Sequence, residues 1–324
     1  MSKKIALIGC GNIGSRHLQA LVKLPFSTEI SIVEPNKNAQ RVGLERLNQM
    51  KNNNKKQNIF WYSSINELKD KFDVVIIATT AKDRIKVINK LLKMGNTRFL
   101  IEKIVCQSLS EYNILLKNIK KNNAKGWVNT NMPYFKTYQN IKKYFKNSER
   151  IHISLTTAGH YGLGTNAIHY LDFFCWFTNN YKITLDGKFL FNKLFSNKRG
   201  KKLVEFAGML SGENKDGSTI TLNFIPNSDL PLILNIYGNN NKHLLIDEVA
   251  EKTWNILDKK SNFSYNYEHT SGLTTKIISD IIKKDDCKLT TVENSFYIHK
   301  ELFRIFNAHI EKITHKRKKI CPIT

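Results

Sequence analysis

The sequence has few cysteines, only five in 324 residues. They are scattered, with no CxxC pair and no histidines beside them at the spacing of a metal site. This scarcity predicts a reducing compartment and no structural zinc, so we expect no bound metal. The five positions are Cys10, Cys106, Cys175, Cys287 and Cys321.

Long hydrophobic runs are also absent, and no apolar stretch is long enough to span a bilayer. The beginning, "MSKKIALIGCGNIG", lacks the long apolar region and cleavage site of a signal peptide and is typical of a first strand. We therefore expect a cytoplasmic protein. The 41% hydrophobic content is enough for a real core, and the length favours two domains.

Acidic residues are scarce, 27 against 51 lysines and arginines, and the formal net charge is +24. Such an excess raises nucleic acid or an anionic membrane surface as partners. Lysine and asparagine are spread along the whole chain, however, as in "KNNNKKQN" and "GNNNK", and no groove-reading element is recognisable. We expect no nucleic acid and no membrane partner, and the tail "HKRKK" to be the solvated end of the last helix.

Residues 1–125 alternate buried strands with amphipathic helices, as in "KIALIG", "SRHLQALVKL" and "EISIVEP". This alternation predicts an α/β domain with a Rossmann, doubly wound parallel sheet. In residues 126–324 the pattern changes to one helix over 166–177, a series of alternating segments punctuated by turns, and two final helices. That pattern predicts an α+β domain with a mainly antiparallel open sheet. The Asn/Lys-rich stretch 51–58 is expected to be a loop.

The motif "GCGNIG" places Gly9, Gly11 and Gly14 as GxGxxG between a strand and a helix. In a dinucleotide site the first glycine permits a tight turn, the second lets the backbone approach the pyrophosphate, and the third allows close helix packing. Asn12 and Ile13 belong to the same expected cofactor turn. The alternative is that these glycines serve only a strand-to-helix turn.

Glu34 follows the second strand, twenty residues after Gly14, where a ribose-binding carboxylate is expected. A carboxylate accepts hydrogen bonds from the ribose diol but repels a 2′-phosphate, so NAD is preferred over NADP. Lys37 and Arg41 lie nearby in the sequence, and their positive charges would favour the 2′-phosphate of NADP.

Two further strands end in polar residues at the same carboxyl edge of the predicted sheet, where open α/β sheets place ligands. "ATT" places Thr79 and Thr80 beside the cofactor crevice, and "IEK" places Glu102 and Lys103 where nicotinamide and substrate would meet. The alternatives are that Thr80 is an ordinary helix cap and that the charged pair is a solvated strand end.

The stretch "HYGLGTNAIHYLDFF" places Thr165, His169 and Asp172 on one face of a helix. A histidine has a suitable pKa for taking the proton of an alcohol during oxidation. The alternative is a polar patch satisfied within the core. The glycines at 162 and 164 suggest exposed N–H groups at the helix start that could receive an anionic substrate group.

"GCGNIGSRH", "SIVEP", "ATT" and "IEKI", followed by a mixed α/β half, resemble the glucose-fructose oxidoreductase / inositol dehydrogenase family (Gfo/Idh/MocA). The resemblance implies that Lys103 holds and polarises the reacting hydroxyl, although Ile104 replaces the usual proline. It also implies that His169 exchanges the proton, oriented by Asp172 or Asn166. Thr165 stands where the family tends to have an aspartate.

The resemblance further implies that Asn129 in "VNTNMP" reaches the active site, while Arg84 takes a place where a histidine is common. Tyr161, Thr165 and Asn166 complete the expected substrate-binding set. We expect an NAD-dependent oxidoreductase acting on a secondary hydroxyl or ketone of a sugar-like substrate, with a nucleotide-activated or acidic sugar of surface-polysaccharide biosynthesis as the preferred class. Self-association through the open C-terminal sheet is implied too. The alternative function is a non-catalytic NAD-binding regulator of the same fold.

Overall fold

The computed structural model describes residues 2–50, 57–200, 202–257, 263–266, 268 and 270–324. The chain divides into two compact units, each with its own core. Unit 1 comprises Met1–Cys106, Ser110–Asn131 and Glu268–Val292. Unit 2 comprises Gln107–Leu109, Met132–Tyr267 and Glu293–Thr324. The chain thus returns to unit 1 late in the sequence, at Glu268–Val292, and no local sequence pattern predicts this return.

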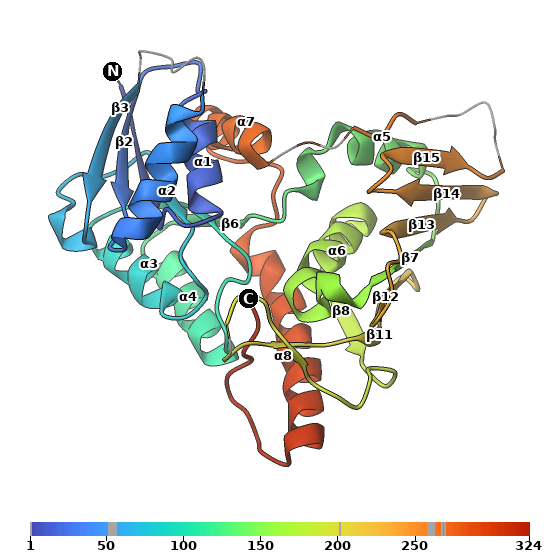
Figure 1. Ribbon diagram of the computed structural model, residues 1–324. Helices are drawn as coiled ribbons and strands as arrows, with labels where there is room; N and C mark the ends of the chain where they lie inside the picture. The colour runs from blue at the N-terminus through green and yellow to red at the C-terminus, as the bar shows by residue number, and fades with distance from the viewer. Residues whose placement is uncertain (1, 51–56, 201, 258–262, 267, 269) are drawn as a thin grey trace. The chain divides into compact units, whose positions relative to one another are not determined.

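Unit 1 is built on a six-stranded parallel sheet in the order β3-β2-β1-β4-β5-β6 (Figure 1). Its strands are β1 (Lys3–Ile8), β2 (Thr28–Val33), β3 (Gln57–Tyr62), β4 (Val74–Ile77), β5 (Arg98–Ile101) and β6 (Lys125–Val128). The central strands β1 and β4 are runs of apolar residues because both faces of the sheet are covered. The strand order reverses between β1 and β4, and ligands of such sheets bind outside the carboxyl ends at this point.

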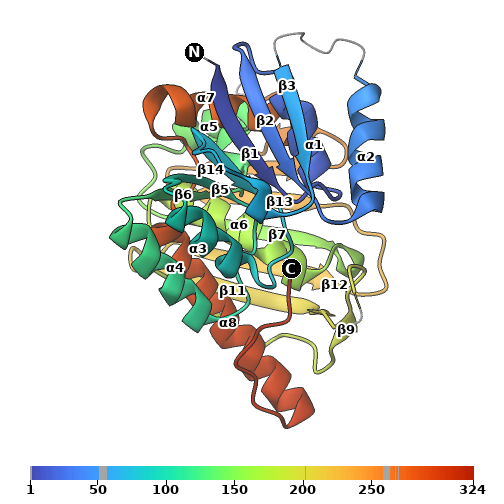
Figure 2. The same ribbon diagram turned by 90° about the vertical axis from the view of Figure 1, so that its left-hand side faces the viewer.

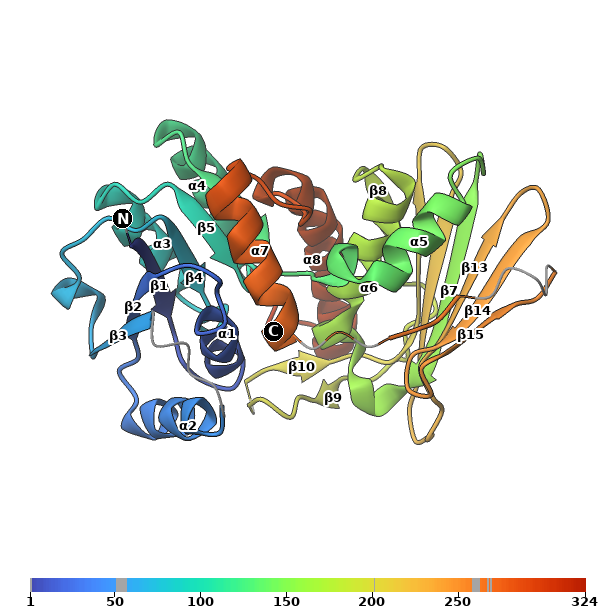
Figure 3. The same ribbon diagram turned by 90° about the horizontal axis from the view of Figure 1, so that it is seen from above.

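The helices of unit 1 cover both faces of the sheet. They are α1 (Gly14–Leu21), α2 (Lys37–Asn48), the short η1 (Ile65–Glu67), α3 (Arg84–Lys93), α4 (Leu109–Lys121) and α7 (Thr270–Lys284). Figures 2 and 3 show α3 and α4 on one face and α1 and α2 on the other, as right-handed crossovers in opposite directions require. Helix α7 packs against α1. The predicted Rossmann sheet is confirmed.

Unit 2 contains a seven-stranded sheet in the order β15-β14-β13-β7-β12-β11-β8. Its strands are β7 (Ile151–Ala158), β8 (Ile183–Asp186), β11 (Gly208–Asn214), β12 (Thr219–Ile225), β13 (Ile233–Gly238), β14 (Lys242–Asp247) and β15 (Lys252–Asn255). Strands β7 and β12 pair in parallel, and the other neighbours pair antiparallel. The prediction of a mainly antiparallel sheet is confirmed.

Helices cover one face of this second sheet. They are the short η2 (Met132–Tyr134) and η3 (Gly159–Tyr161), together with α5 (Lys136–Tyr144), α6 (Leu163–Thr178) and α8 (Val292–Thr314). In the described part of the chain the other face carries no helix (Figure 3). A separate short ribbon pairs β9 (Phe195–Ser196) with β10 (Val204–Glu205).

The expected loop over 51–58 needs one correction. Residues 51–56 lie outside the described residues, but Gln57 and Asn58 begin β3 and pair with Thr28 and Glu29 of β2. The segment "QNIFWY" forms an edge strand that is only half buried, so it lacks the apolar run that marks the central strands. No helix among the described residues combines the length and apolarity that a bilayer crossing requires.

Candidate active site

The glycine turn joins the end of β1 to α1. Gly9 has a φ of +91°, which only glycine adopts without strain, and its N–H donates to Val33 O at 2.8 Å. A Cβ on Gly14 would lie 2.0 Å from Gly9 O, so the helix packs directly on the turn. A Cβ on Gly11 would meet nothing within 4 Å. The turn is therefore closed on the protein side at Gly9 and Gly14 and open at Gly11, the arrangement that a bound pyrophosphate needs.

Glu34 lies directly beside this turn. Its residue is only 8% exposed, and its two carboxylate oxygens accept hydrogen bonds from Cys10 N at 2.7 Å and Asn36 N at 2.9 Å. Burial and the Glu34 charge raise the pKa of the Cys10 thiol to about 12, so this thiol stays protonated. The ribose role of Glu34 stays a prediction, and the structure holds its carboxylate at the strand end where that role requires it.

Asn12 and Ile13 form the outer side of the turn. Arg46 of α2 donates to Asn12 O at 2.8 Å and to Ser15 Oγ at 2.6 Å, while Ile13 is 41% exposed. Arg46 therefore fixes α2 to the glycine turn and brings a positive charge to it. The sequence does not predict this role of Arg46, because the charges of α2 show no distinctive pattern around it.

The carboxyl ends of β4, β5 and β6 extend the hydrogen-bond ladder by one residue each. Ala78 N donates to Ile8 O at 2.8 Å, Glu102 N to Ile77 O at 3.0 Å, and Asn129 N to Ile101 O at 2.8 Å. The sheet thus presents its predicted site residues from consecutive strands along one edge.

Thr79 and Thr80 follow β4 at this edge. The buried Oγ1 of Thr79 finds no hydrogen-bond partner within the described residues, whereas Thr80 is exposed. Helix α3 begins only at Arg84 with Asp83 before it, so Thr80 is not the cap of this helix. An unsatisfied buried hydroxyl at the strand end fits a ligand that supplies its partner.

Glu102 is buried in a network that joins four elements. Its carboxylate accepts from Asn129 Nδ2 and contacts His17 Nε2 at 3.0 Å, and His17 Nδ1 contacts Thr274 Oγ1 of α7 at 2.9 Å. Burial would raise the pKa of Glu102, but the bonds from His17 and Asn129 and the charge of Arg84 lower it to about 2. Glu102 is thus a carboxylate fixed in its ionised form, and the alternative of a solvated strand end is wrong.

Arg84 holds the two loops that follow β4 and β5. Its buried guanidinium donates to the carbonyl oxygens of Thr79, Glu102 and Ile104, and burial lowers its pKa to about 10. Lys103, half-buried, lies between two of these anchored residues, and the Lys103–Ile104 peptide bond is cis. A single side chain therefore fixes the backbone on both sides of the predicted oxyanion-holding lysine.

Helix α6 of unit 2 carries the predicted proton acceptor. His169 is half-buried, Asp172 is fully buried, and Asn166 Nδ2 donates to Tyr161 O, while the Tyr161 ring is 37% exposed and stacks on His160 at 4.5 Å. The predicted helical face with its polar residues is therefore present, and its catalytic role stays a prediction.

The start of α6 departs from the sequence expectation. Glu205 of β10 places its carboxylate against the first turn, where it accepts from the Gly164 and Thr165 N–H groups and from Thr165 Oγ1. Asn197 Nδ2 also donates to it at 2.7 Å. A Cβ on Gly162 would lie 2.7 Å from the Glu205 carboxyl carbon. The expectation that these N–H groups could receive an anionic substrate group is wrong, because a protein carboxylate occupies them.

The predicted residues fall into two groups. Unit 1 brings together the glycine turn, Glu34, Thr79, Glu102 and Asn129 at one sheet edge, with Lys103 among them, and unit 2 carries Tyr161, Thr165, Asn166, His169 and Asp172. Asn129 was expected in the substrate pocket, and the structure shows its amide bonded to Glu102. His17 and Glu205 were missed, because their partners lie 85 and 40 residues away along the chain.

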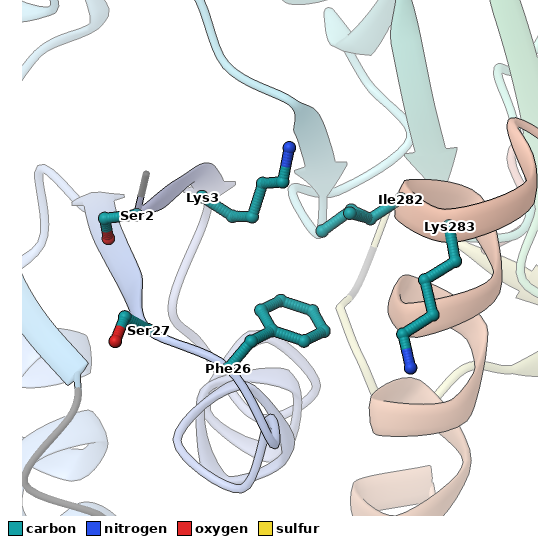
Figure 4. A pocket seen from close by; sticks show the side chains of 6 residues that line it. All are labelled: Ser2, Lys3, Phe26, Ser27, Ile282 and Lys283. Atoms are coloured by element: carbon teal, nitrogen blue, oxygen red, sulfur yellow. The ribbon is translucent and has the colours of Figure 1, made fainter.

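A shallow pocket of about 460 Å³ lies at the opposite end of the unit 1 sheet (Figure 4). It is lined at the amino ends of β1 and β2 and by α7, through Ser2, Lys3, Phe26, Ser27, Ile282 and Lys283. Because ligands of doubly wound sheets bind at the carboxyl ends, this pocket is separate from the predicted cofactor site.

Residues 3–130 match the family model GFO_IDH_MocA, described as "Oxidoreductase family, NAD-binding Rossmann fold". No curated protein matches the chain.

Solved structures share the whole fold at low identity. An oxidoreductase from Agrobacterium radiobacter in complex with NAD+, L-tartaric acid and magnesium has 14% identity and a TM-score of 0.68, covering 98% of each chain. The WlbA dehydrogenase from Bordetella pertussis in complex with NADH and UDP-GlcNAcA has 13% identity and a TM-score of 0.69, covering 100% of this chain and 99% of that one. The UDP-N-acetylglucosamine 3-dehydrogenase GnnA from Acidithiobacillus ferrooxidans has 11% identity and a TM-score of 0.71, covering 97% and 99%. At these identities the likeness concerns the fold.

Proposed function

We propose that this chain, whose residues 3–130 belong to the Gfo/Idh/MocA family of NAD-binding oxidoreductases, interconverts a secondary hydroxyl and a ketone on a sugar-like substrate. The observation that carries the proposal is the carboxyl edge of the unit 1 sheet, where an open Gly11, a buried Glu34 and the anchored Glu102–Lys103 stretch follow neighbouring strands. NAD, when bound, supplies the acceptor or donor of the hydride.

Residues of this edge fit the cofactor. The turn at Gly9, Gly11 and Gly14 offers backbone N–H groups and the start of α1 to a pyrophosphate. Glu34 offers carboxylate oxygens to a ribose diol, and the Thr79 hydroxyl has a hydrogen bond to give or accept. These features support NAD binding through this chain's own residues.

The proposed chemistry at the substrate needs one proton acceptor and one group that stabilises the developing oxyanion. His169 takes the hydroxyl proton during oxidation and returns it during reduction. Lys103 holds the reacting oxygen, where its positive charge stabilises negative charge as it develops. Asp172 or Asn166 orients His169, and Asn129, Tyr161 and Thr165 complete the substrate-binding set.

For the substrate we propose a nucleotide-activated or acidic sugar of surface-polysaccharide biosynthesis. Two relatives of the same fold carry such ligands or substrates in their names, UDP-GlcNAcA and UDP-N-acetylglucosamine. The net charge of +24 favours encounter with an anionic substrate.

Two finer proposals concern the setting of the enzyme. All five cysteines are thiols, which supports a cytoplasmic location.

The open face of the unit 2 sheet carries Tyr237, His243, Leu245 and Trp254, and the rings of Tyr237 and His243 are stacked with their centroids 4.3 Å apart. A face of this composition supports self-association through the sheet.

A turnover screen tests the proposed function. Purified protein is mixed with NAD+ or NADH and a panel of UDP-sugars, sugar acids, polyols and their keto forms, and cofactor absorbance is followed. We expect turnover with at least one sugar derivative, abolished in Gly11→Val. NAD binding without turnover on the whole panel would favour the non-catalytic regulator instead.

A further inference from the structure

The carboxylate of Glu205 lies one helical turn from the predicted proton acceptor. It accepts from Thr165 N at 3.2 Å and from the Thr165 hydroxyl. Thr165 and His169 are four residues apart on α6, a separation that places their side chains on one face with about 5–6 Å between the Cβ atoms. The carboxylate, the hydroxyl and the imidazole therefore follow one another along the same side of the helix.

The Glu205 side chain is buried and held in place by its neighbours. Only 8% of the residue is exposed, and β10 packs against α6. Asn197, 9% exposed, donates to the carboxylate at 2.7 Å and to Thr165 Oγ1 at 3.3 Å, so the two acceptors share one amide. Gly162 and Gly164 leave the room that the carboxylate fills.

The donors that hold Glu205 are neutral, namely the Thr165 hydroxyl, the Asn197 amide and backbone N–H groups. Burial raises the pKa of Glu205, and these hydrogen bonds oppose the increase. The titratable groups on the elements around it are His169 and the buried Asp172 on α6, His309 of α8, whose ring centroid lies 5.8 Å from that of Phe206, and Arg199 and Lys202 on the connection between β9 and β10.

We propose that Glu205 is a positioning residue for proton transfer, which acts on His169 through the Thr165 hydroxyl and through its charge. When the substrate is oxidised, the hydroxyl proton moves to the His169 imidazole while the hydride leaves for NAD, so a positive imidazolium forms. A carboxylate held one turn away stabilises that charge. This inference rests on the proposed function, since it assigns Glu205 to the same site.

A simple helix cap makes a different prediction. A cap needs only an acceptor for the first N–H groups of α6, and a neutral amide oxygen can serve. Under the proposal the charge itself matters. Glu205→Gln separates the two readings, because it keeps an acceptor of nearly the same shape and removes the charge.

The first measurement is the pH profile of turnover with the best substrate from the screen, in the oxidation direction. For Glu205→Gln we expect turnover to fall about tenfold and the rising acidic limb of kcat/KM to move to lower pH. Without the nearby carboxylate the pKa of His169 should fall, so its neutral, proton-accepting form persists to lower pH. The double variant Thr165→Asp/Glu205→Gln returns a carboxylate to the same face of α6 and should restore the limb. Glu301→Gln, which removes a carboxylate bound to Leu185 N and Arg304, is the matched control and should leave the limb in place.

The second measurement needs no turnover. NMR titration of the His169 ring in the full chain should show it titrating at lower pH in Glu205→Gln than in the wild type, with no such change in Glu301→Gln. Unchanged His169 titration would overturn the proposal, even in an active enzyme. A shifted titration without turnover on any sugar would uphold the Glu205–His169 coupling and overturn the proposed function.

A second variant keeps the proposal testable if Glu205→Gln does not fold. Thr165→Val removes the hydroxyl that lies between the Glu205 carboxylate and the His169 face of α6 and keeps the shape of the side chain. The His169 titration should then move to lower pH, in the same direction as for Glu205→Gln. A Thr165→Val titration that coincides with the wild type would overturn the coupling.

Discussion

Each unit buries a carboxylate beside a predicted catalytic group, but the two carboxylates are compensated differently. Burial would raise the pKa of Glu102, and a hydrogen bond with His17 and the charge of Arg84 lower it to about 2. Burial raises the pKa of Glu205, and its hydrogen bonds come from the Thr165 hydroxyl and other neutral donors. The first carboxylate is part of a charged framework that fixes a loop, whereas the second is held by neutral donors, which leave its charge in the ionised form uncompensated.

The largest expected effect comes from Glu102→Gln. It leaves a buried histidine and the Arg84 guanidinium without their carboxylate, so we expect the free energy of unfolding to fall by about 3–5 kcal/mol. Urea unfolding measures the change. Glu205→Gln is the comparison, and it should lose only about 1 kcal/mol because its lost partners are neutral. Equal losses in the two variants would show that both sites are compensated in the same way.

The pH dependence of stability should have opposite signs at the two sites. Because the pKa of Glu102 is lowered, its contribution is present above the unfolded value of 4.5 and is lost as pH falls toward 2, a change of about 3 kcal/mol. Because the pKa of Glu205 is raised, its contribution is greatest below 4.5 and declines as pH rises through the raised value.

Urea unfolding from pH 3 to pH 7 checks this contrast, with each wild-type value taken relative to Glu102→Gln or Glu205→Gln. The difference from Glu102→Gln should shrink toward acid, and the difference from Glu205→Gln should shrink toward neutral pH. Parallel trends for the two pairs would contradict the assignment of the charges.

The sequence predicts well those features that depend on neighbouring residues alone. The glycine turn, the central strands and the polar strand ends follow from local chemistry, since Gly9 needs a positive φ and buried parallel strands need apolar runs. Figure 1 shows these expected strands in the predicted alternation with helices. Half-exposed elements such as β3 and α5 have weaker patterns and were missed.

The partners of the buried charges could not be predicted in this way. His17 meets Glu102 across 85 residues, and Thr165 meets Glu205 across 40. Strand β10 contains only two residues, too few for any periodicity. Nothing in the local sequence "NKRGKKLVEF" distinguishes Glu205 from an ordinary surface carboxylate, so only the fold reveals that it caps α6.

Replacing the two proposed reacting groups tests whether the two units serve one reaction. His169→Ala and Lys103→Met should each lower turnover by about a hundredfold or more, the usual scale of general acid-base and oxyanion effects. NAD affinity should stay nearly intact. Steady-state kinetics at matched thermal stability gives the answer. Wild-type turnover in His169→Ala would make the histidine a core residue, and Tyr161 would become the next candidate.

The smallest expected effect concerns the choice between NAD(H) and NADP(H), which we expect Glu34 to determine. Glu34 lies at the end of β2 with its oxygens on Cys10 N and Asn36 N, and a 2′-phosphate there would meet its negative charge. We expect NAD(H) to bind about tenfold or more tightly than NADP(H), a difference of about 1.4 kcal/mol. Calorimetric titration of both cofactors measures the ratio.

Glu34→Ala should reduce the ratio, since Arg46 then leaves the turn positively charged. Glu205→Gln should leave the ratio unchanged, because its carboxylate is held by Thr165 and Asn197. Equal affinities in the wild type would remove Glu34 from the selection of the cofactor.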